Sequence, residues 1–292
     1  TSVSVITKLA EKNEETWMML GRLAEKMNDT DRALHSFESV LRHQPYNLKA
    51  LTQIASIYRS KDQYSKAVEY YHRALNVDNE NCEIWGALGH CFLMMDDLQK
   101  AYAAYHQAIF NAKVQQRNKQ DPHLWYGIGI LYERYGSLDN AEEAFSSVIK
   151  MDLSFEKNNE IYFRLGIIYK QQMRYDQSLE CFGNILNNPP SPLTQADIWF
   201  QIGHVYELKK DFEEAKKSYE HVLKYNPNHA KVLQQLGWLY HQNTQFGNQD
   251  VAISYLQRSI EADASDGQTW YLLVRCFMAQ QKYRLAYDAY QQ

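Results

Sequence analysis

The sequence predicts an all-α fold, a right-handed superhelical solenoid of about eight helix-turn-helix repeats. Large and small residues recur with a period of 34 residues, starting near residue 14. The 292 residues include 22 Tyr and 6 Trp but only 6 Pro and 12 Gly, which suits helices packed through bulky side chains. Hydrophobic residues make up 45% of the chain, close to the globular average, so a packed core is expected.

The repeats follow one another with two irregularities. We predict an N-terminal helix or lead-in at 1–13 and repeats at 14–47, 48–81, 82–115, 122–155, 159–192, 196–229, 230–266 and 267–292. A six-residue insertion precedes the fourth repeat, three extra residues lengthen the turn of the seventh, and the eighth is incomplete. We expect the lead-in to cover the open face of the first repeat, and more repeats or a capping helix to follow the eighth.

Four positions, counted from the start of each repeat, define the pattern: a large residue at 4 and at 24, and a small residue at 8 and at 20. In chain order these residues are Trp17, Gly21, Ala33 and Phe37; Leu51, Ala55, Ala67 and Tyr71; Trp85, Gly89, Ala101 and Tyr105; Trp125, Gly129, Ala141 and Phe145; Tyr162, Gly166, Ser178 and Phe182; Trp199, Gly203, Ala215 and Tyr219; Leu233, Gly237, Ala252 and Leu256; Trp270, Val274, Ala286 and Tyr290.

Each position has a steric cause. Small residues at 8 and 20 let the two helices of a repeat approach closely, and the large residues fall on faces that pack between helices. Val274 departs from this rule and puts the local helix packing in doubt. The spacing is that of the tetratricopeptide repeat, in which stability comes from stacking neighbours along the array.

Composition excludes several classes of function. The formal charge is −4 and no basic run occurs, so direct binding to nucleic acid is not expected. No apolar run approaches the roughly 18 residues that span a bilayer. The four cysteines are far apart, which indicates neither a disulfide framework nor a zinc site and favours a reducing compartment.

No residue pattern indicates catalysis. The ten histidines form no HExxH motif and no finger spacing with cysteine, so they predict no metal site. Gly127 and Gly129 resemble the start of a dinucleotide loop, but Tyr132 stands where the third glycine is needed, and the repeat explains Gly129. We expect a non-enzymatic protein without a cofactor.

Function is therefore expected on the concave surface, which resemblance to other tetratricopeptide arrays assigns to positions 2, 5, 9 and 12. Aromatic residues at these positions indicate a groove for an extended peptide or an amphipathic helix. They are Tyr126, Phe163, Phe200, Trp238 and Tyr271. The N-terminal repeats offer a mixed surface that suits a helical partner: Met18, Arg22, Glu25, Arg59, Leu93 and Met94. The alternatives are rings that only pack between repeats and a solvated face.

Position 6 contains no Asn in any repeat, which disfavours the carboxylate clamp of co-chaperones and the asparagine ladder of the nuclear sugar transferase. Long segments instead resemble one family. They are LGHCFLMMDDLQKAYAAYHQAI at 88–109, GIGILYERYGSLDNAEEAF at 127–145, NEIYFRLGIIYK at 159–170, YEHVL at 219–223 and HAKVLQQLGWLY at 229–240. They resemble the fungal general transcriptional corepressor of the Cyc/Ssn type, the partner of the Tup-type WD-repeat corepressor.

The resemblance implies a nuclear, non-enzymatic adaptor that bridges DNA-bound repressors to the Tup-type subunit and to chromatin-modifying machinery such as histone deacetylases. It implies that the first three repeats, roughly 14–115, dock a helical N-terminal segment of the Tup-type partner. Later repeats would hold sequence-specific DNA-binding repressors. The family has about ten repeats followed by glutamine-rich sequence, which implies that this chain is a fragment.

Two alternatives stay open. The first is a regulatory array attached to a chromatin enzyme such as a histone demethylase, whose tetratricopeptide domain is similar. The second is a scaffold of a cytosolic complex such as a ubiquitin-ligase assembly.

Overall fold

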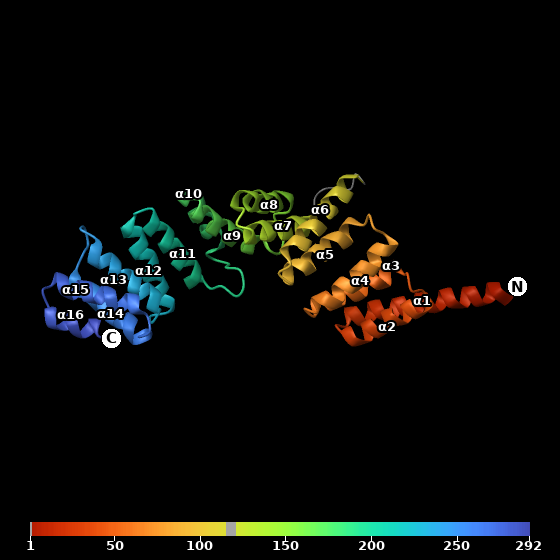
Figure 1. The fold of residues 1–292 in the computed structure, drawn as a ribbon, viewed down its shortest axis with the longest axis horizontal. Coiled ribbons are helices and arrows are strands. Elements are labelled where there is room, and N and C mark those ends of the chain that lie inside the picture. The colour runs from red at the N-terminus through yellow and green to blue at the C-terminus, as the bar shows by residue number, and fades with distance from the viewer. Residues whose placement is uncertain (1, 115–120) are drawn as a thin grey trace. The chain divides into compact units, whose positions relative to one another are not determined.

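The chain folds into α-helices joined by short turns. The structure is a computed structural model that describes residues 2–114 and 121–292, with side chains from Lys12 onward. Within these residues there are sixteen helices and no strand, which confirms the all-α prediction (Figure 1). None of the helices in the described ranges is long and apolar enough to cross a membrane.

Successive helices form pairs, and the first helix of each pair carries positions 1 to 13 of a repeat. The pairs are α1 (Ser2–Lys26) with α2 (Thr30–His43), α3 (Leu48–Ser60) with α4 (Tyr64–Val77), α5 (Cys82–Met94) with α6 (Leu98–Val114), α7 (Pro122–Arg134) with α8 (Leu138–Met151), α9 (Asn158–Gln171) with α10 (Tyr175–Ile185), α11 (Gln195–Leu208) with α12 (Phe212–Tyr225), α13 (Ala230–Gln242) with α14 (Gln249–Ala262), and α15 (Gly267–Ala279) with α16 (Tyr283–Tyr290).

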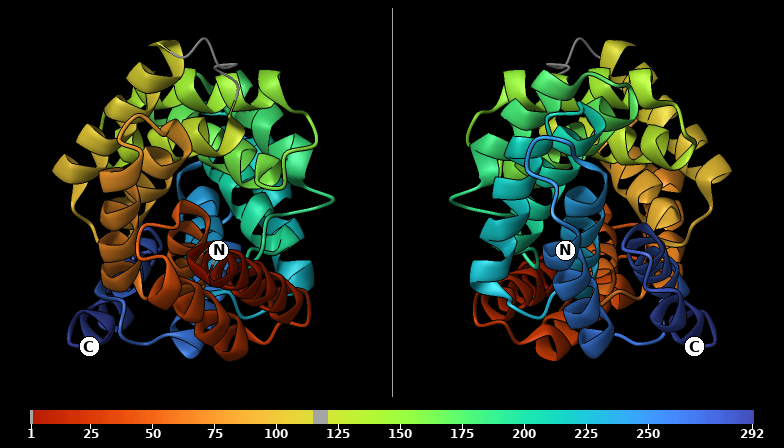
Figure 2. Two further views of the ribbon diagram at one scale, coloured as in Figure 1. Left: turned by 90° about the vertical axis from the view of Figure 1, so that its right-hand side faces the viewer. Right: turned by 90° about the vertical axis from the view of Figure 1, so that its left-hand side faces the viewer.

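The pairs belong to two compact units, residues 1–153 with α1 to α8 and residues 154–292 with α9 to α16. Within each unit, neighbouring pairs stack on one another (Figure 2), and their buried residues form several hydrophobic clusters. Each core is built from the small and large residues of the repeat pattern, such as Ala67 and Tyr71 in the first unit. Stability in such an array comes from interfaces between neighbouring repeats.

The small residue at position 8 lies under the ring at position 24 of the same repeat. A Cβ added to Gly166 would lie 2.7 Å from Cε1 of Phe182, a distance that real Cβ contacts do not show. Gly203 meets Tyr219 in the same way, at 2.6 Å. The requirement for glycine therefore comes from the ring of the second helix, which lies flat against the backbone of the first.

Two departures from the pattern have different outcomes. Ser178, at the position that is otherwise Ala, is fully buried, and its Oγ donates a 2.6 Å hydrogen bond to the carbonyl of Gly166. That bond satisfies the hydroxyl inside the core. Val274 replaces the glycine of the eighth repeat, and the ring of Tyr290 that would cover it is 76% exposed.

The turn inside a repeat places position 15 in the left-handed region of backbone space. Seven repeats share this feature, and the residues are Asn28, Asp62, Asp96, Gly136, Met173, Lys210 and Gln281, with φ between 56° and 74°. The seventh repeat differs because its turn is longer and spans residues 243–248. Three of the six non-glycine residues are Asn28, Asp62 and Asp96, and Asn and Asp adopt this conformation more readily than other residues with a Cβ.

The lead-in does not fold back over the first repeat. Residues from Ser2 onward continue in the same helix as the first helix of that repeat, and this N-terminal part of α1 extends beyond the other helices of its unit (Figure 1). Leu20 and Leu23 are 44% and 55% exposed. The expectation that the lead-in covers the open face is therefore wrong for the described backbone, while the side chains of residues 1–11 lie outside the described part.

Candidate protein-binding surfaces

The first candidate surface lies on α1, and we call it the α1 apolar face. It consists of Met19, Leu20, Leu23 and Met27, which are between 44% and 68% exposed. Leu20 and Leu23 occupy positions 7 and 10. In the second repeat these positions are buried, as Ile54 and Ile57. The α1 apolar face is thus the side of a repeat that normally packs against a preceding helix.

Two of the six residues predicted for the N-terminal surface are buried in the core instead. Met18 is 9% exposed and packs in the cluster that contains Ile54 of α3. Leu93 is 1% exposed and belongs to the cluster that contains Leu131 of α7. An apolar side chain at these positions gains more free energy by packing on the next repeat than by facing water. Both residues are corrections to the predicted surface.

The other four residues of that prediction reach the surface to different degrees. Arg22 and Met94 are exposed, and Glu25 and Arg59 are half-buried. Burial raises the pKa of Glu25, and the nearby Arg22 opposes the shift. Burial, followed by the charge of Arg59, lowers the pKa of His90. The sequence reasoning missed the α1 apolar face, although the spacing of Met19, Leu23 and Met27 by four residues was a usable signal.

The second candidate surface is a hollow in the second unit, and we call it the α13–α15 hollow. Its volume is about 370 Å³, and its lining combines two aromatic rings with amide and charged side chains. The lining residues are Glu207, Gln234, Gln235, Trp238, Gln268, Tyr271, Leu272 and Arg275. The guanidinium of Arg275 lies 5.3 Å from the ring centroid of Trp238, which is a cation–π contact. The structure thus brings the predicted Trp238 and Tyr271 together at one site.

The remaining predicted aromatic residues do not line this hollow. Phe163 makes an edge contact with the core ring Phe182 at 5.8 Å, and Phe200 lies 6.1 Å from Tyr219. Tyr126, in the first unit, lies 6.3 Å from Phe145. All three rings are half-buried and lean on the position 24 ring of their own repeat. This geometry matches the alternative in which such rings pack within the array.

Polar residues continue from the hollow along α9, α11 and α13. Lys170 Nζ donates to Gln201 Oε1 at 2.7 Å and lies 3.5 Å from Nδ1 of His204. Lys231 Nζ donates to Gln234 Oε1 at 2.7 Å. Burial lowers the pKa of Lys170, and burial together with Lys170 and Lys231 lowers the pKa of His204. Burial is the main cause of both shifts, and the two lysines add to it at His204.

Two hydrogen-bonded groups hold the polar wall of the hollow in place. Gln234 is 2% exposed, and its Nε2 donates to Thr269 Oγ1 at 2.8 Å and to Asp266 Oδ2 at 2.9 Å. Glu207 Oε2 accepts a 2.7 Å hydrogen bond from the hydroxyl of Tyr219. Burial raises the pKa of Glu207, while the bond to Tyr219 and the charge of Lys231 oppose the shift. These hydrogen bonds satisfy the buried polar groups of the wall.

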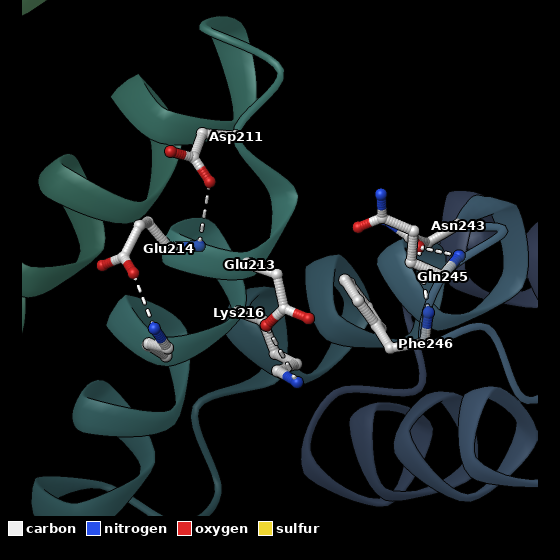
Figure 3. A network of polar contacts seen from close by, with 8 residues as sticks. Asp211, Glu213, Glu214, Lys216, Asn243, Gln245 and Phe246 are labelled. Atoms are coloured by element: carbon white, nitrogen blue, oxygen red, sulfur yellow. Dashed lines mark hydrogen bonds and ion pairs between the residues drawn. The ribbon is translucent and has the colours of Figure 1, made fainter.

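A further hollow of about 480 Å³ lies beside the long turn of the seventh repeat. Figure 3 shows the turn held by Asn243, whose Oδ1 accepts hydrogen bonds from the amides of Gln245 and Phe246. Lys216 pairs with Glu213 at 3.4 Å and lies 4.5 Å from the ring centroid of Phe246. Side chains of both charges line this hollow, so its composition indicates no particular class of ligand.

Among the residues that the structure describes, no group of three or more His, Cys, Asp and Glu side chains is placed to hold a metal ion. The cysteines are free thiols, and Cys91, Cys181 and Cys276 are buried.

Comparison with known proteins identifies the fold and the relatives. Models described as tetratricopeptide repeat match residues 14–47, 50–83, 122–155 and 196–229. The solved C-terminal part of a TPR repeat-containing protein from Cytophaga hutchinsonii is similar in fold, with a TM-score of 0.63 at 13% identity, and the match covers 82% of this chain and 93% of that one. This likeness concerns the fold alone.

The similarity in sequence is much closer to two corepressors. General transcriptional corepressor trfA of Dictyostelium discoideum is 69% identical over 288 residues, which is 99% of this chain and 20% of the relative. General transcriptional corepressor ssn6 of Schizosaccharomyces pombe is 65% identical over 288 residues, which is 98% of this chain and 26% of the relative. The chain thus spans about a quarter or less of the length of these relatives.

The helix pairs, the buried glycine contacts and the open surfaces define the chain as a tetratricopeptide-repeat scaffold. Its relatives are corepressors that share these repeats. The chain belongs to the family of general transcriptional corepressors of the Cyc/Ssn type. The similarity to trfA shows that this family is not restricted to fungi.

Proposed function

We propose that this chain is the adaptor region of a nuclear corepressor complex, which binds a Tup-type WD-repeat subunit through its first unit and DNA-binding repressors through its second. The observation that carries the proposal is the presence of two surfaces with different chemistry, one in each unit. The α1 apolar face is aliphatic, whereas the α13–α15 hollow is aromatic and charged. Different surfaces allow different partners to bind the same chain.

The α1 apolar face supports a helical partner. Leu20 and Leu23 lie where another repeat would place a helix, and a partner helix can pack on them in the same way. Burying four large aliphatic side chains is worth several kcal/mol of binding free energy, at roughly 25 cal/mol per Å² of apolar surface. Arg22 and Glu25 lie on the same helix and supply polar contacts at the edge.

The corepressor relatives support the regulatory role. A chain that holds a repressor and a repression module together raises the effective concentration of the module at a promoter, without any catalytic step. Histone deacetylases and related chromatin machinery would then act through the assembled complex. The same role places the chain in the nucleus.

A tethered repression assay tests the proposal. The chain is fused to a heterologous DNA-binding domain, and repression of a reporter is measured together with capture of the Tup-type subunit. We expect Leu23→Glu to abolish both, and Trp238→Ala to leave both unchanged while capture of DNA-binding repressors by the untethered chain is lost. If the two variants had equal effects on all three measurements and their melting curves were unchanged, the two units would not bind different partners, and the proposal would be wrong.

A further inference from the structure

Three cations lie in or beside the α13–α15 hollow: Arg275 in its lining, Lys231 bonded to the lining residue Gln234, and Lys170 further along on α9. Lys170, Lys231 and Arg275 form no ion pair within the part of the chain that the structure describes. Lys170 and Lys231 donate to neutral amide oxygens, and Arg275 lies over an aromatic ring. Their positive charge is therefore available to a ligand.

The nearby carboxylates are engaged by other groups of the fold and, among the described residues, form no ion pair with these three cations. Asp266 caps the N-terminus of α15 and also accepts hydrogen bonds from Gln234 and from the backbone amide of Gln268. Asp197 is part of the capping box of α11, and Glu160 is paired with Arg164 at 2.9 Å. Glu207 lines the hollow and accepts a hydrogen bond from the hydroxyl of Tyr219. Each of these groups already has a partner or a helix terminus.

The lining of the hollow also favours the binding of an apolar side chain. Trp238 is half-buried and Tyr271 is 59% exposed, and Leu272 completes the wall between them. A volume of about 370 Å³ admits one or two large side chains of a partner. Aromatic rings favour contact with an apolar side chain, and a neighbouring guanidinium or ammonium favours a carboxylate.

We propose that the α13–α15 hollow selects acidic peptide segments that carry an aromatic or large aliphatic anchor. The anchor would enter between Trp238 and Tyr271, and carboxylates on either side would pair with Arg275 and Lys231. Lys170 and His204 would extend the positive surface toward α9. This inference rests on the proposed function, because it specifies the kind of partner segment that the second unit holds.

Peptide selection on the 292-residue chain tests the inference. A phage library of random dodecapeptides is selected on the immobilised chain, and the recovered sequences are compared with the unselected library. We expect an excess of Asp and Glu around at least one aromatic or large aliphatic residue. The selection could instead recover neutral or basic peptides that the Trp238→Ala variant no longer binds. That outcome would overturn the preference for acidic peptides, although it would still show that this surface binds peptides.

The affinity of a recovered peptide, synthesised with a fluorescein label, is then measured by fluorescence anisotropy. We expect Arg275→Gln and Lys231→Gln each to weaken binding about tenfold, in line with the loss of a charge-assisted hydrogen bond. Lys217→Gln is the matched control, because Lys217 is exposed and pairs with Glu214 on α12. Equal affinity for all three variants would overturn the inference, with melting curves excluding unfolding as a cause of lost binding.

Two further measurements decide between sources of negative charge. A peptide with every Glu and Asp replaced by Gln and Asn should bind at least tenfold more weakly than its parent. A twelve-nucleotide oligothymidine should not displace the labelled peptide at equal concentration. Displacement that depends on Arg275 and Lys231 would assign the site to nucleic acid and overturn the peptide proposal. Failure of the proposed function would appear separately, because the unmutated chain would then not repress the reporter in the tethered assay.

Discussion

The hydroxyl of Tyr219, on the second helix of its repeat, donates a 2.7 Å hydrogen bond to Glu207 on the first. The ring of Tyr219 is fully buried, so the bond joins the core of the second unit to the polar wall of the α13–α15 hollow. Packing and surface charge are thus coupled at one residue pair, and a change in either partner affects both.

Replacing Glu207 by Gln should change how stability depends on pH. Burial raises the pKa of Glu207 above its ordinary 4.5, so the folded chain holds this proton more tightly than the unfolded chain. The wild type therefore loses stability as pH rises from the ordinary carboxyl pKa through the raised one. Gln keeps the acceptor for Tyr219 without the charge, so Glu207→Gln should raise the melting temperature at pH 7.

The gain from Glu207→Gln should shrink toward zero below about pH 4, where both forms of residue 207 are neutral. Thermal unfolding followed by circular dichroism at several pH values checks this, with the exposed Glu261→Gln as the control. A gain of the same size at every pH would show that burial of the charge is not its cause.

Gly166→Leu should destabilise the second unit by roughly 2 to 4 kcal/mol, because the new side chain must displace the ring of Phe182 from the core. Gly183 on α10 is the matched control, since nothing lies within 4 Å of a Cβ added there. Gly183→Ala should be neutral or stabilising by up to about 1 kcal/mol, in line with helix propensity. Urea unfolding measures both, and an unchanged midpoint for Gly166→Leu would contradict the close contact between Gly166 and Phe182.

Met173→Gly should stabilise the fifth repeat by about 0.5 kcal/mol. Met173 has a φ of 61°, and a left-handed conformation costs a residue with a Cβ about 1–2 kcal/mol. Glycine removes that cost. It also gives the unfolded chain more conformational freedom, which reduces the net gain in stability. The neighbouring Gln172 has an ordinary φ of −80°, so Gln172→Gly should only destabilise. A chemical unfolding midpoint that fell equally for both variants would rule out the strained turn.

Only Cys82 should react quickly with a thiol reagent in the native chain. Burial raises the pKa of Cys91 and of Cys276 to about 11, so little of the reactive thiolate forms at about pH 8. Cys82 is half-exposed. Titration with a chromogenic disulfide should give about one fast thiol per chain, removed by Cys82→Ser, and the rest only in denaturant. Two or more fast thiols in the native chain would contradict the burial of Cys91, Cys181 and Cys276.

The repeats were predictable because their requirements are local and periodic. Gly166 and Phe182 lie in one helix pair, and the same steric demand recurs in each repeat, so the sequence itself displays it. The family was predictable from segments such as 159–170, which include residues that the repeat leaves free. For the predicted concave surface at positions 2, 5, 9 and 12, the sequence supplied candidate residues but not which of them are exposed.

Which candidates reach solvent was decided by packing between repeats, where each side chain has a different neighbour. Leu93 is buried against the next repeat and Phe163 leans on its own core ring, whereas Tyr271 is exposed beside the hollow. The amino-acid sequence alone determined the helix pairs and their spacing, because these depend on contacts within one 34-residue period. Tertiary structure alone decided the charge and depth of the α13–α15 hollow, because they depend on side chains from three helices that no single repeat contains.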